Sequence, residues 1–425
     1  MGKGRPSRCH TPFCERFCYR PLSAASPPAS SYRSLLALTC ALAFASYFAT
    51  SLRLPVMPLF AVSLGATTSE VGFINSSFLL MCGLLALPLG ILGDRWGRRR
   101  IINLGLIIAA AGSLLLYWSR SPRELIAIYL IFGVGLAMIG PSLMAQVADI
   151  SPASHLGRAY GWYTTAIYTA MSLGPAVGGI LAEFLGYRAI FFIVALAMFA
   201  LVAPVSLFLP VRPPTAGHEW RHLWTTLAAE GGHNRPLQGC WAITLGSCTA
   251  LGVFFTFFPL YALQFGLNAG EIGVIFAGQA LINALSRIPL GRISDRTDKT
   301  TLSLWGFLGL SLVLLGFVFC QQFLPFLLLA MLSGAVQGVG FTPLGALISE
   351  VVPPEARGLA MGGYNTAIYL GMMLGSAAMG PFISTWGFEA GFVAAAVINL
   401  GGVAGLYFLG RRQRPVTAIT ASGKN

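Results

Sequence analysis

Apolar segments alternate with short polar breaks along nearly the whole chain. A helix needs roughly 20 mostly apolar residues to cross a bilayer, and six segments of that length precede a polar stretch at 211–237 while six follow it. They lie at 34–61, 70–92, 101–119, 124–148, 159–184 and 188–209, and then at 238–264, 271–293, 301–320, 325–349, 359–384 and 388–409. None shows the residue-by-residue apolar–polar alternation of a membrane barrel strand. The pattern therefore predicts an all-α integral membrane protein with twelve transmembrane helices.

The second set of segments repeats the first at a constant offset of 201 residues, which takes Gly90 to Gly291. The same offset relates further positions of like type: Pro58 and Pro259, Gly65 and Gly266, Glu70 and Glu271, Asp149 and Glu350, Gly174 and Gly375, and Gly186 and Gly387. A repeat of this regularity indicates two copies of one architectural unit. We therefore predict pseudo-symmetric six-helix halves at 34–210 and 238–410, a central linker at 211–237, and tails at 1–33 and 411–425.

Composition supports this class, because 56% of the residues are hydrophobic and only 10% are charged, whereas a soluble domain has about 25% charged residues. The net charge of +13 is unevenly placed, since 22 of the 27 Lys and Arg residues fall in the tails and in the loops on the same side of the membrane as the tails. This excess predicts a multi-pass protein of the plasma (inner) membrane with both termini in the cytoplasm. It is not a nucleic-acid-binding pattern, and the lipid bilayer is the expected partner of the outer surface.

The eight cysteines predict neither a disulfide framework nor a metal site. Five lie inside apolar segments, where Cys behaves as a small hydrophobic residue. Cys9, Cys14 and Cys18 lie in the N-terminal tail beside His10, with a spacing that fits no standard zinc pattern. We expect no cofactor and no bound metal, a monomer, and a membrane-surface helix around 220–227 in the central linker.

The loop between the second and third segments resembles a family signature. Its sequence GILGDRWGRR is similar to the motif G-x-x-x-D-R/K-x-G-R/K-R/K of the major facilitator superfamily, with matches at Gly90, Asp94, Arg95, Gly97, Arg98 and Arg99. The second copy departs at 298 and 300 and keeps the motif at Gly291, Asp295, Arg296 and Lys299. The resemblance covers 34–410 and implies a transporter whose two six-helix halves rock around a site near the bilayer midplane. A glycine at 90 would also let two helices approach closely.

The charged residues of this loop suggest a conformational latch. Arg95 or Arg98 can pair with Asp149 at the cytoplasmic end of the fourth span, and the offset places Glu350 opposite Arg296 in the second half. The carboxylate of Asp94 would be stabilised by the N-terminus of a neighbouring helix. Such a latch would hold the cytoplasmic side closed in the outward-facing state and break in the inward-facing state. The alternative is that these cations only fix the topology.

The fifth segment has small residues on one face. Its pattern Gly161-x8-Ala170-x3-Gly174-Pro175-x2-Gly178-Gly179 resembles the antiporter motif of the same superfamily, with alanine at one glycine position. Residues 170, 174 and 178 share a face that can pack closely against a neighbour, and the proline bends the helix. The resemblance implies proton-linked export, while close helix packing alone is the alternative.

Arg53 is the sharpest candidate for substrate binding. Counting from the first turn places it near the bilayer centre, where an ionisable residue marks a functional site by default. Its counterpart in the second half is Phe254, so the shared fold does not require the charge. A guanidinium with no evident acidic partner suggests an anionic or polar substrate. A structural arginine bonded to backbone carbonyls at the bend of Pro55 and Pro58 is the alternative.

Polar stripes on otherwise apolar segments supply further candidates. Gln279, Asn283 and Arg287 repeat at i, i+4 and i+8 and so share one helix face. Lipid would penalise that face, so it either lines a cavity between the halves or hydrogen-bonds to a neighbouring helix, and both alternatives stay open. Polar residues on three other segments extend the set. The expected substrate-binding residues are Arg53, Tyr168, Gln279, Asn283, Gln337 and Tyr369.

No Asp or Glu lies near the middle of a predicted span, which bears on proton coupling. Glu70 and Glu271 complete capping boxes that begin helices. Tyr129 and Phe132 stand where many drug/proton antiporters of the superfamily have the Arg and Gln of a fourth-helix motif. Our first hypothesis is a proton-coupled exporter of a small organic compound, and the alternative is a carrier or exchanger for an organic anion or polar metabolite held by Arg53. A membrane enzyme is disfavoured, because no cluster of His and acidic residues lies at the midplane.

Overall fold

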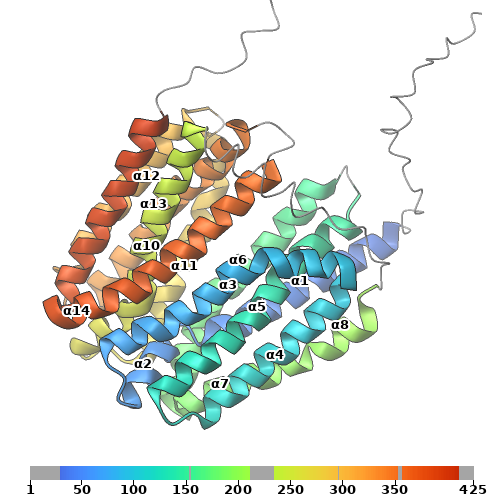
Figure 1. Cartoon of the computed structure of the whole chain (residues 1–425), viewed down its shortest axis with the longest axis horizontal. Coiled ribbons are helices and arrows are strands. Elements are labelled where there is room, and N and C mark those ends of the chain that lie inside the picture. The colour runs from blue at the N-terminus through green and yellow to red at the C-terminus, as the bar shows by residue number, and fades with distance from the viewer. Residues whose placement is uncertain (1–28, 153–154, 211–233, 295, 353–356, 411–425) are drawn as a thin grey trace, which may run out of the picture.

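Two bundles of helices, one from each half of the chain, make up the structure (Figure 1). The first contains α1 Ala29–Leu52, α2 Val56–Ser63, α3 Thr68–Trp96, α4 Arg98–Trp118, α5 Pro122–Ile150, α6 Leu156–Leu185, α7 Tyr187–Ala200 and α8 Val202–Phe208. The second contains α10 Arg235–Gln264, α11 Ala269–Ser294, α12 Lys299–Phe317, α13 Phe323–Glu350 and α14 Arg357–Gly410. This computed structural model describes residues 29–152, 155–210, 234–294, 296–352 and 357–410. The tail cysteines, the expected linker helix and Asp295 lie outside the described residues.

Eleven of the described helical segments are long and apolar enough to cross a bilayer. The last of them, Ala360–Gly410, contains two spans, because Gly387 has a φ of 85° and breaks α14. α1 and α2 together form one span with an internal break, as do α7 and α8. The prediction of twelve transmembrane helices in two six-helix halves is therefore confirmed.

Glycine makes the sharp turns at equivalent positions of both halves. Gly65 and Gly266 have φ angles of 85° and 80°, and Gly186 and Gly387 have φ angles of 80° and 85°. Each of the four has open space where a Cβ atom would lie. The left-handed backbone conformation, and not crowding, therefore requires glycine here.

Each half begins its second span with the predicted capping box. The backbone N–H of Thr67 donates to Glu70 Oε2 at 2.8 Å, and that of Asn268 donates to Glu271 Oε2 at 2.9 Å. In return, the two glutamate N–H groups donate to Thr67 Oγ1 at 3.3 Å and to Asn268 Oδ1 at 2.8 Å. Both glutamates thus satisfy backbone groups that a helix start would leave unpaired.

The halves meet where α3 packs against α14 and α6 packs against α11. A Cβ atom at Gly72 would overlap the carbonyl oxygen of Ser376, and one at Gly273 would overlap that of Pro175. The offset of 201 residues turns one of these contacts into the other, so the interface has the pseudo-symmetry of the fold. Glycine permits the close approach of two backbones at both places.

Hydrogen bonds join the halves at the end of the bundle opposite the termini. Ser69 Oγ lies 3.4 Å from Ser384 Oγ, and Asn268 Nδ2 donates to Glu183 Oε1 at 3.4 Å. From this end the two bundles diverge toward the ends of the helices that continue into the tails (Figure 1). The halves are therefore in contact at one end of the bundle and set apart at the other.

The small-residue face of α6 packs against α1. A Cβ atom at Gly178 would overlap the carbonyl group of Leu52, and one at Gly174 would lie 2.5 Å from Ser51 Cβ. Gly161, at the start of the same motif, has nothing within 4 Å. Packing against α1 therefore requires glycine at 174 and 178, and a Cβ atom at Gly179 would overlap the carbonyl oxygen of Ala269 in α11. Gly161 is the one motif glycine that packing does not require.

We expect Gly178→Ala to lower the apparent melting temperature of the purified protein, because α1 and α6 must move apart at a cost of about 1–3 kcal/mol. Gly161→Ala is the matched control on the same helix, and it should leave the melting temperature unchanged or slightly raised, since alanine favours helix. Thermal unfolding followed by tryptophan fluorescence compares the two variants. Equal melting temperatures would contradict the packing of Gly178 against α1.

Candidate functional site

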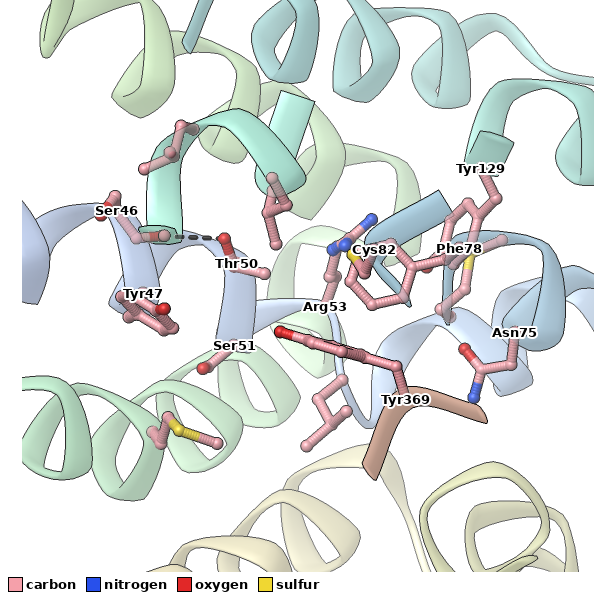
Figure 2. Close-up of a pocket in the computed structure, with 16 residues that line it drawn as sticks. Ser46, Tyr47, Thr50, Ser51, Arg53, Asn75, Phe78, Cys82, Tyr129 and Tyr369 are labelled. Atoms are coloured by element: carbon pink, nitrogen blue, oxygen red, sulfur yellow. Dashed lines mark hydrogen bonds between the residues drawn. The ribbon is translucent and has the colours of Figure 1, made fainter. Parts of the chain in front are cut away.

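A cavity of about 220 Å³ lies within the first half, where α1, α2, α3, α5 and α6 surround it, and α14 of the second half closes one side (Figure 2). Most of its lining is apolar and includes Leu54, Met57, Leu136, Ile139 and Met171. The polar groups that reach it include Tyr47, Thr50, Arg53, Asn75 and Tyr369. Tyr369 is the one described lining residue that belongs to the second half.

Arg53 lies in the break between α1 and α2. Pro55 has no backbone N–H and interrupts the helix, so α1 ends at Leu52 and the N–H of Met57 begins the next turn by donating to the carbonyl oxygen of Arg53 at 2.9 Å. The Arg53 residue is only 4% exposed. The prolines thus place the arginine at an interruption of the first span, with its side chain inside the bundle.

Aromatic rings surround the guanidinium group of Arg53. Its Cζ atom lies 3.3 Å from the ring centroid of Phe132, 4.9 Å from that of Tyr129 and 5.1 Å from that of Phe78. Its Nη1 atom is buried and has no hydrogen-bond partner among the described residues. Cation–π contacts at these distances stabilise the charge but do not use the N–H donors.

The sequence did not predict this aromatic cage as part of the site. Tyr129 and Phe132 of α5 were notable only for departing from the fourth-helix motif of drug/proton antiporters. The structure shows that both departures occur at the positions that contact Arg53. A basic residue at 129 would lie beside another cation, so the change in α5 and the arginine of the first span are physically compatible with each other.

Four of the six expected binding residues lie in a second polar cluster, away from the described lining of the cavity. Asn283 Nδ2 donates to the carbonyl oxygen of Gly334 at 3.3 Å and lies 3.5 Å from Gln337 Oε1. Arg287 Nε donates to Asn283 Oδ1 at 3.1 Å, and its Cζ atom lies 4.5 Å from the ring centroid of Tyr168. Gln279, one turn away on α11, is 4% exposed. These contacts fit the interhelical alternative for the α11 stripe, and they connect α11 to α13 and α6.

The second polar cluster is the pseudo-symmetric counterpart of the cavity. The offset of 201 residues converts cavity residues into cluster residues: Phe78 into Gln279, Cys82 into Asn283, Leu136 into Gln337, and Tyr168 of the cluster into Tyr369 of the cavity. Arg53 converts into Phe254, whose ring centroid lies 5.0 Å from Phe258, 5.5 Å from Phe276 and 5.3 Å from Phe317. Packed aromatic rings therefore take up the space that Arg53 occupies in the first half.

Equivalent ion pairs tie the loop motif to the neighbouring helices in both halves. Arg98 donates through Nε to Asp149 Oδ2 and so joins α4 to α5. Lys299 Nζ lies 2.9 Å from Glu350 Oε1 and joins α12 to α13. The expected pairing of Glu350 with Arg296 is wrong, because Lys299 is the first residue of α12, the position that Arg98 has in α4.

The remaining loop residues differ in role. Arg99 donates to the carbonyl oxygens of Ser206 and Leu209 and thereby satisfies the C-terminal end of α8. Arg95 is exposed, and the side chain of Asp94 lies outside the described part of the structure. The expected close approach at Gly90 is not found, since a Cβ there would meet Pro141 Cβ at an ordinary 3.8 Å, and Gly291 has nothing within 4 Å.

The loop glycine itself is needed in the first half only. Gly97 has a φ of 90° and lies between α3 and α4. Its counterpart Asp298 has a φ of −64° and accepts a hydrogen bond from the N–H of Thr301 at 2.8 Å, which caps α12. The departure of the second motif copy from glycine is therefore matched by a different turn.

We expect a double-mutant cycle of Arg98→Gln and Asp149→Asn to give a coupling energy of about 0.5–2 kcal/mol. The matched cycle of Lys299→Gln and Glu350→Gln should give less, because the Glu350 side chain is 57% exposed and that of Asp149 only 27%, and exposed pairs contribute little. Apparent unfolding free energies of the purified variants provide both values. A larger coupling in the second half would contradict this ranking.

Comparison with known proteins agrees with this architecture. The model of the Major Facilitator Superfamily matches residues 39–269 and 240–424. The chain is 22% identical over 354 residues to an uncharacterized MFS-type transporter of Methanocaldococcus jannaschii, covering 81% of this chain and 90% of that protein. It is 24% identical over 377 residues to the quinolone resistance protein NorA of Staphylococcus aureus, covering 85% and 92%. A crystal structure of a bacterial homolog of the human lysosomal transporter Spinster, inward-facing and occupied, matches with a TM-score of 0.75 at 15% identity, covering 89% of this chain and 97% of that one. The chain therefore belongs to the Major Facilitator Superfamily.

Proposed function

We propose that this protein exports a small organic compound by alternating access and binds it in the Arg53 cavity. One observation supports this more than any other: the cavity is built on the first half, and α14 of the second half contributes Tyr369 to it. A movement of one half against the other changes the wall that Tyr369 provides. Binding and conformational change are thereby coupled at one place.

The arrangement of the helices fits the inward-facing state of the cycle. The halves are joined at the end opposite the termini and diverge toward the ends that continue into the tails. The distribution of Lys and Arg favours a cytoplasmic location of those tails in the plasma membrane. The inward-facing conformation of the matching Spinster homolog supports the same assignment.

Export, rather than uptake, is favoured by two likenesses. The fifth-span motif resembles that of antiporters, and the relative NorA, which matches 85% of this chain, is a quinolone resistance protein.

None of the described residues lining the cavity is Asp or Glu. We therefore propose that coupling to protons involves carboxylates away from the cavity, namely Asp94 and Glu183.

A latch between the halves, in our proposal, involves Asp94 together with the first turn of α14. The Arg98–Asp149 and Lys299–Glu350 pairs each join helices of the same half. They are present while the halves diverge at that end, so neither pair alone holds the halves together. Asp94 is the acidic residue of the first loop motif and lies near the end of α3, next to the loop.

Transport by reconstituted protein tests the proposal directly. Proteoliposomes with an imposed pH gradient should accumulate either norfloxacin, a fluorescent quinolone, or a small organic anion such as radiolabelled benzoate, and the accumulation should stop when an ionophore collapses the gradient. Liposomes without the protein are the control. Accumulation that continues after collapse contradicts proton coupling, and the absence of accumulation for norfloxacin and for small organic anions alike contradicts the proposed transport.

A further inference from the structure

We propose that the Arg53 cavity recognises a compact organic anion with one negative charge and an apolar body. The inference rests on the proposed function and names the class of compound that the site takes. It follows from the charge inside the cavity, from the unused hydrogen-bond donor and from the nature of the remaining lining.

The charge of Arg53 is buried without an anionic partner. The residue is 4% exposed, and none of the described lining residues is acidic. Removing a cation from water carries a large free-energy cost. An ion pair recovers that cost only if its geometry is good and its hydrogen bonds are satisfied. Cation–π contacts with the three rings offset part of this cost. They leave the buried Nη1 donor without a hydrogen bond, which is a separate cost.

The geometry of the guanidinium group indicates where a negatively charged ligand would bind. The ring of Phe132, 3.3 Å from Cζ, covers one face of the planar group, so its N–H donors point sideways, and Nη1 has no partner among the described residues. A planar guanidinium presents its donors as a fork that matches the two oxygens of a carboxylate. Figure 2 shows Arg53 among the side chains that line the cavity, which also include Thr50, Cys82 and Tyr369. A ligand carboxylate beside Nη1 would lie in the cavity that these groups line.

The site supplies one positive charge and no more. The position equivalent to Arg53 in the second half is Phe254, packed among other rings. Arg287, the other arginine inside a span, already donates to Asn283 and stacks on Tyr168. A dianion would keep one charge uncompensated in an apolar cavity, which is costly. The single positive charge of the cavity therefore matches a ligand with one negative charge.

The rest of the lining and the volume limit the body of the ligand. Met57, Leu136, Ile139 and Met171 offer apolar contact. The cavity of about 220 Å³ is smaller than the roughly 300–1,000 Å³ of pockets that hold drug-sized ligands. Small aromatic or aliphatic carboxylates meet both conditions.

Three probes that share one ring and differ in charge provide the test: benzoate, benzamide and benzylammonium, at equal ionic strength. Binding of each probe to the purified full-length protein is measured as a rise in melting temperature and as a dissociation constant by isothermal titration calorimetry. Benzoate should bind wild type at least about 30-fold more tightly than benzamide does, the factor expected for 2 kcal/mol from a buried ion pair.

Arginine variants assign the effect to the cavity. Arg53→Met should weaken benzoate by a similar factor of about 30 and leave benzamide unchanged, while Arg53→Lys retains charge and should lose less. Arg287→Met is the matched control, the other intramembrane arginine, and should bind benzoate like wild type. If Arg53→Met does not fold, the wild-type ranking of the three probes and the Arg53→Lys variant still decide the matter.

The outcomes separate the inference from the proposed function. If benzylammonium or benzamide binds more tightly than benzoate, or if benzoate binds Arg53→Met as well as wild type, the anion assignment is wrong while a ligand-binding cavity stands. If no probe of any charge binds, the cavity is not a binding site and both proposals are overturned.

Discussion

Arg53→Met is expected to abolish transport by reconstituted protein while leaving the fold intact. The substitution removes the cation from a cavity in which its Nη1 atom has no partner among the described residues. Losing one partner of a buried charge pair costs about 2–5 kcal/mol, which corresponds to a loss of roughly 30- to 4,000-fold in kcat/KM. Initial rates in proteoliposomes, normalised to incorporated protein, measure the effect.

The melting temperature of the same variant distinguishes a binding role from a structural role. Replacing an unpaired buried charge by an apolar side chain of similar length is neutral or stabilising. The melting temperature of Arg53→Met should therefore equal or exceed that of wild type. A lower melting temperature together with lost transport would instead show that Arg53 supports the bend at Pro55, and full activity would remove it from the site.

A disulfide across the closed end of the bundle should stop transport. Ser69 Oγ of α3 and Ser384 Oγ of α14 are 3.4 Å apart, so sulfur atoms in the double variant Ser69→Cys/Ser384→Cys come within reach of the S–S bond length of about 2.05 Å with small movements. The two halves must separate at this end for the cavity to open on the other side of the membrane. Oxidation is therefore expected to reduce transport to the background rate, and a reductant should restore it.

The single variants Ser69→Cys and Ser384→Cys, treated with the same oxidant, are the controls for reaction of native cysteines. Gel mobility after proteolysis between the halves confirms the cross-link. The opposite outcome is a cross-linked protein that transports as fast as the same protein with the disulfide reduced. The contact of α3 with α14 would then persist throughout the cycle, and alternating access by separation of the halves would be incorrect.

The number and length of the helices and their division into two repeated halves were predictable, because each follows from a pattern along the sequence. Apolar length defines a span, and a constant offset between like residues defines the repeat. The partner of Asp149 was predicted as either Arg95 or Arg98, because the sequence places Asp149 and these cations at the cytoplasmic ends of neighbouring spans. Arg296 was assigned to Glu350 in error, because a choice between two cations three residues apart depends on the turn that precedes α12.

The composition of the site was less predictable, because it depends on which helix faces which. The polar stripe of α11 is visible in the sequence, but its partner is not. Gly334 allows the α13 backbone to approach Asn283, and so the stripe bonds to α13. The aromatic cage had only one signal in the sequence, the departure of Tyr129 and Phe132 from a family motif, and its meaning depends on the distance to Arg53 across the bundle.

The packed rings around Phe254 have a consequence for the stoichiometry of the cycle. A duplicated fold starts with two equivalent places for a ligand, and here one of them holds Arg53 while the other is occupied by phenylalanine side chains. If the ligand binds at Arg53, as we propose, we expect each cycle to move one molecule. Initial rates should then follow a simple hyperbola in ligand concentration, and two compounds that bind there should inhibit each other competitively.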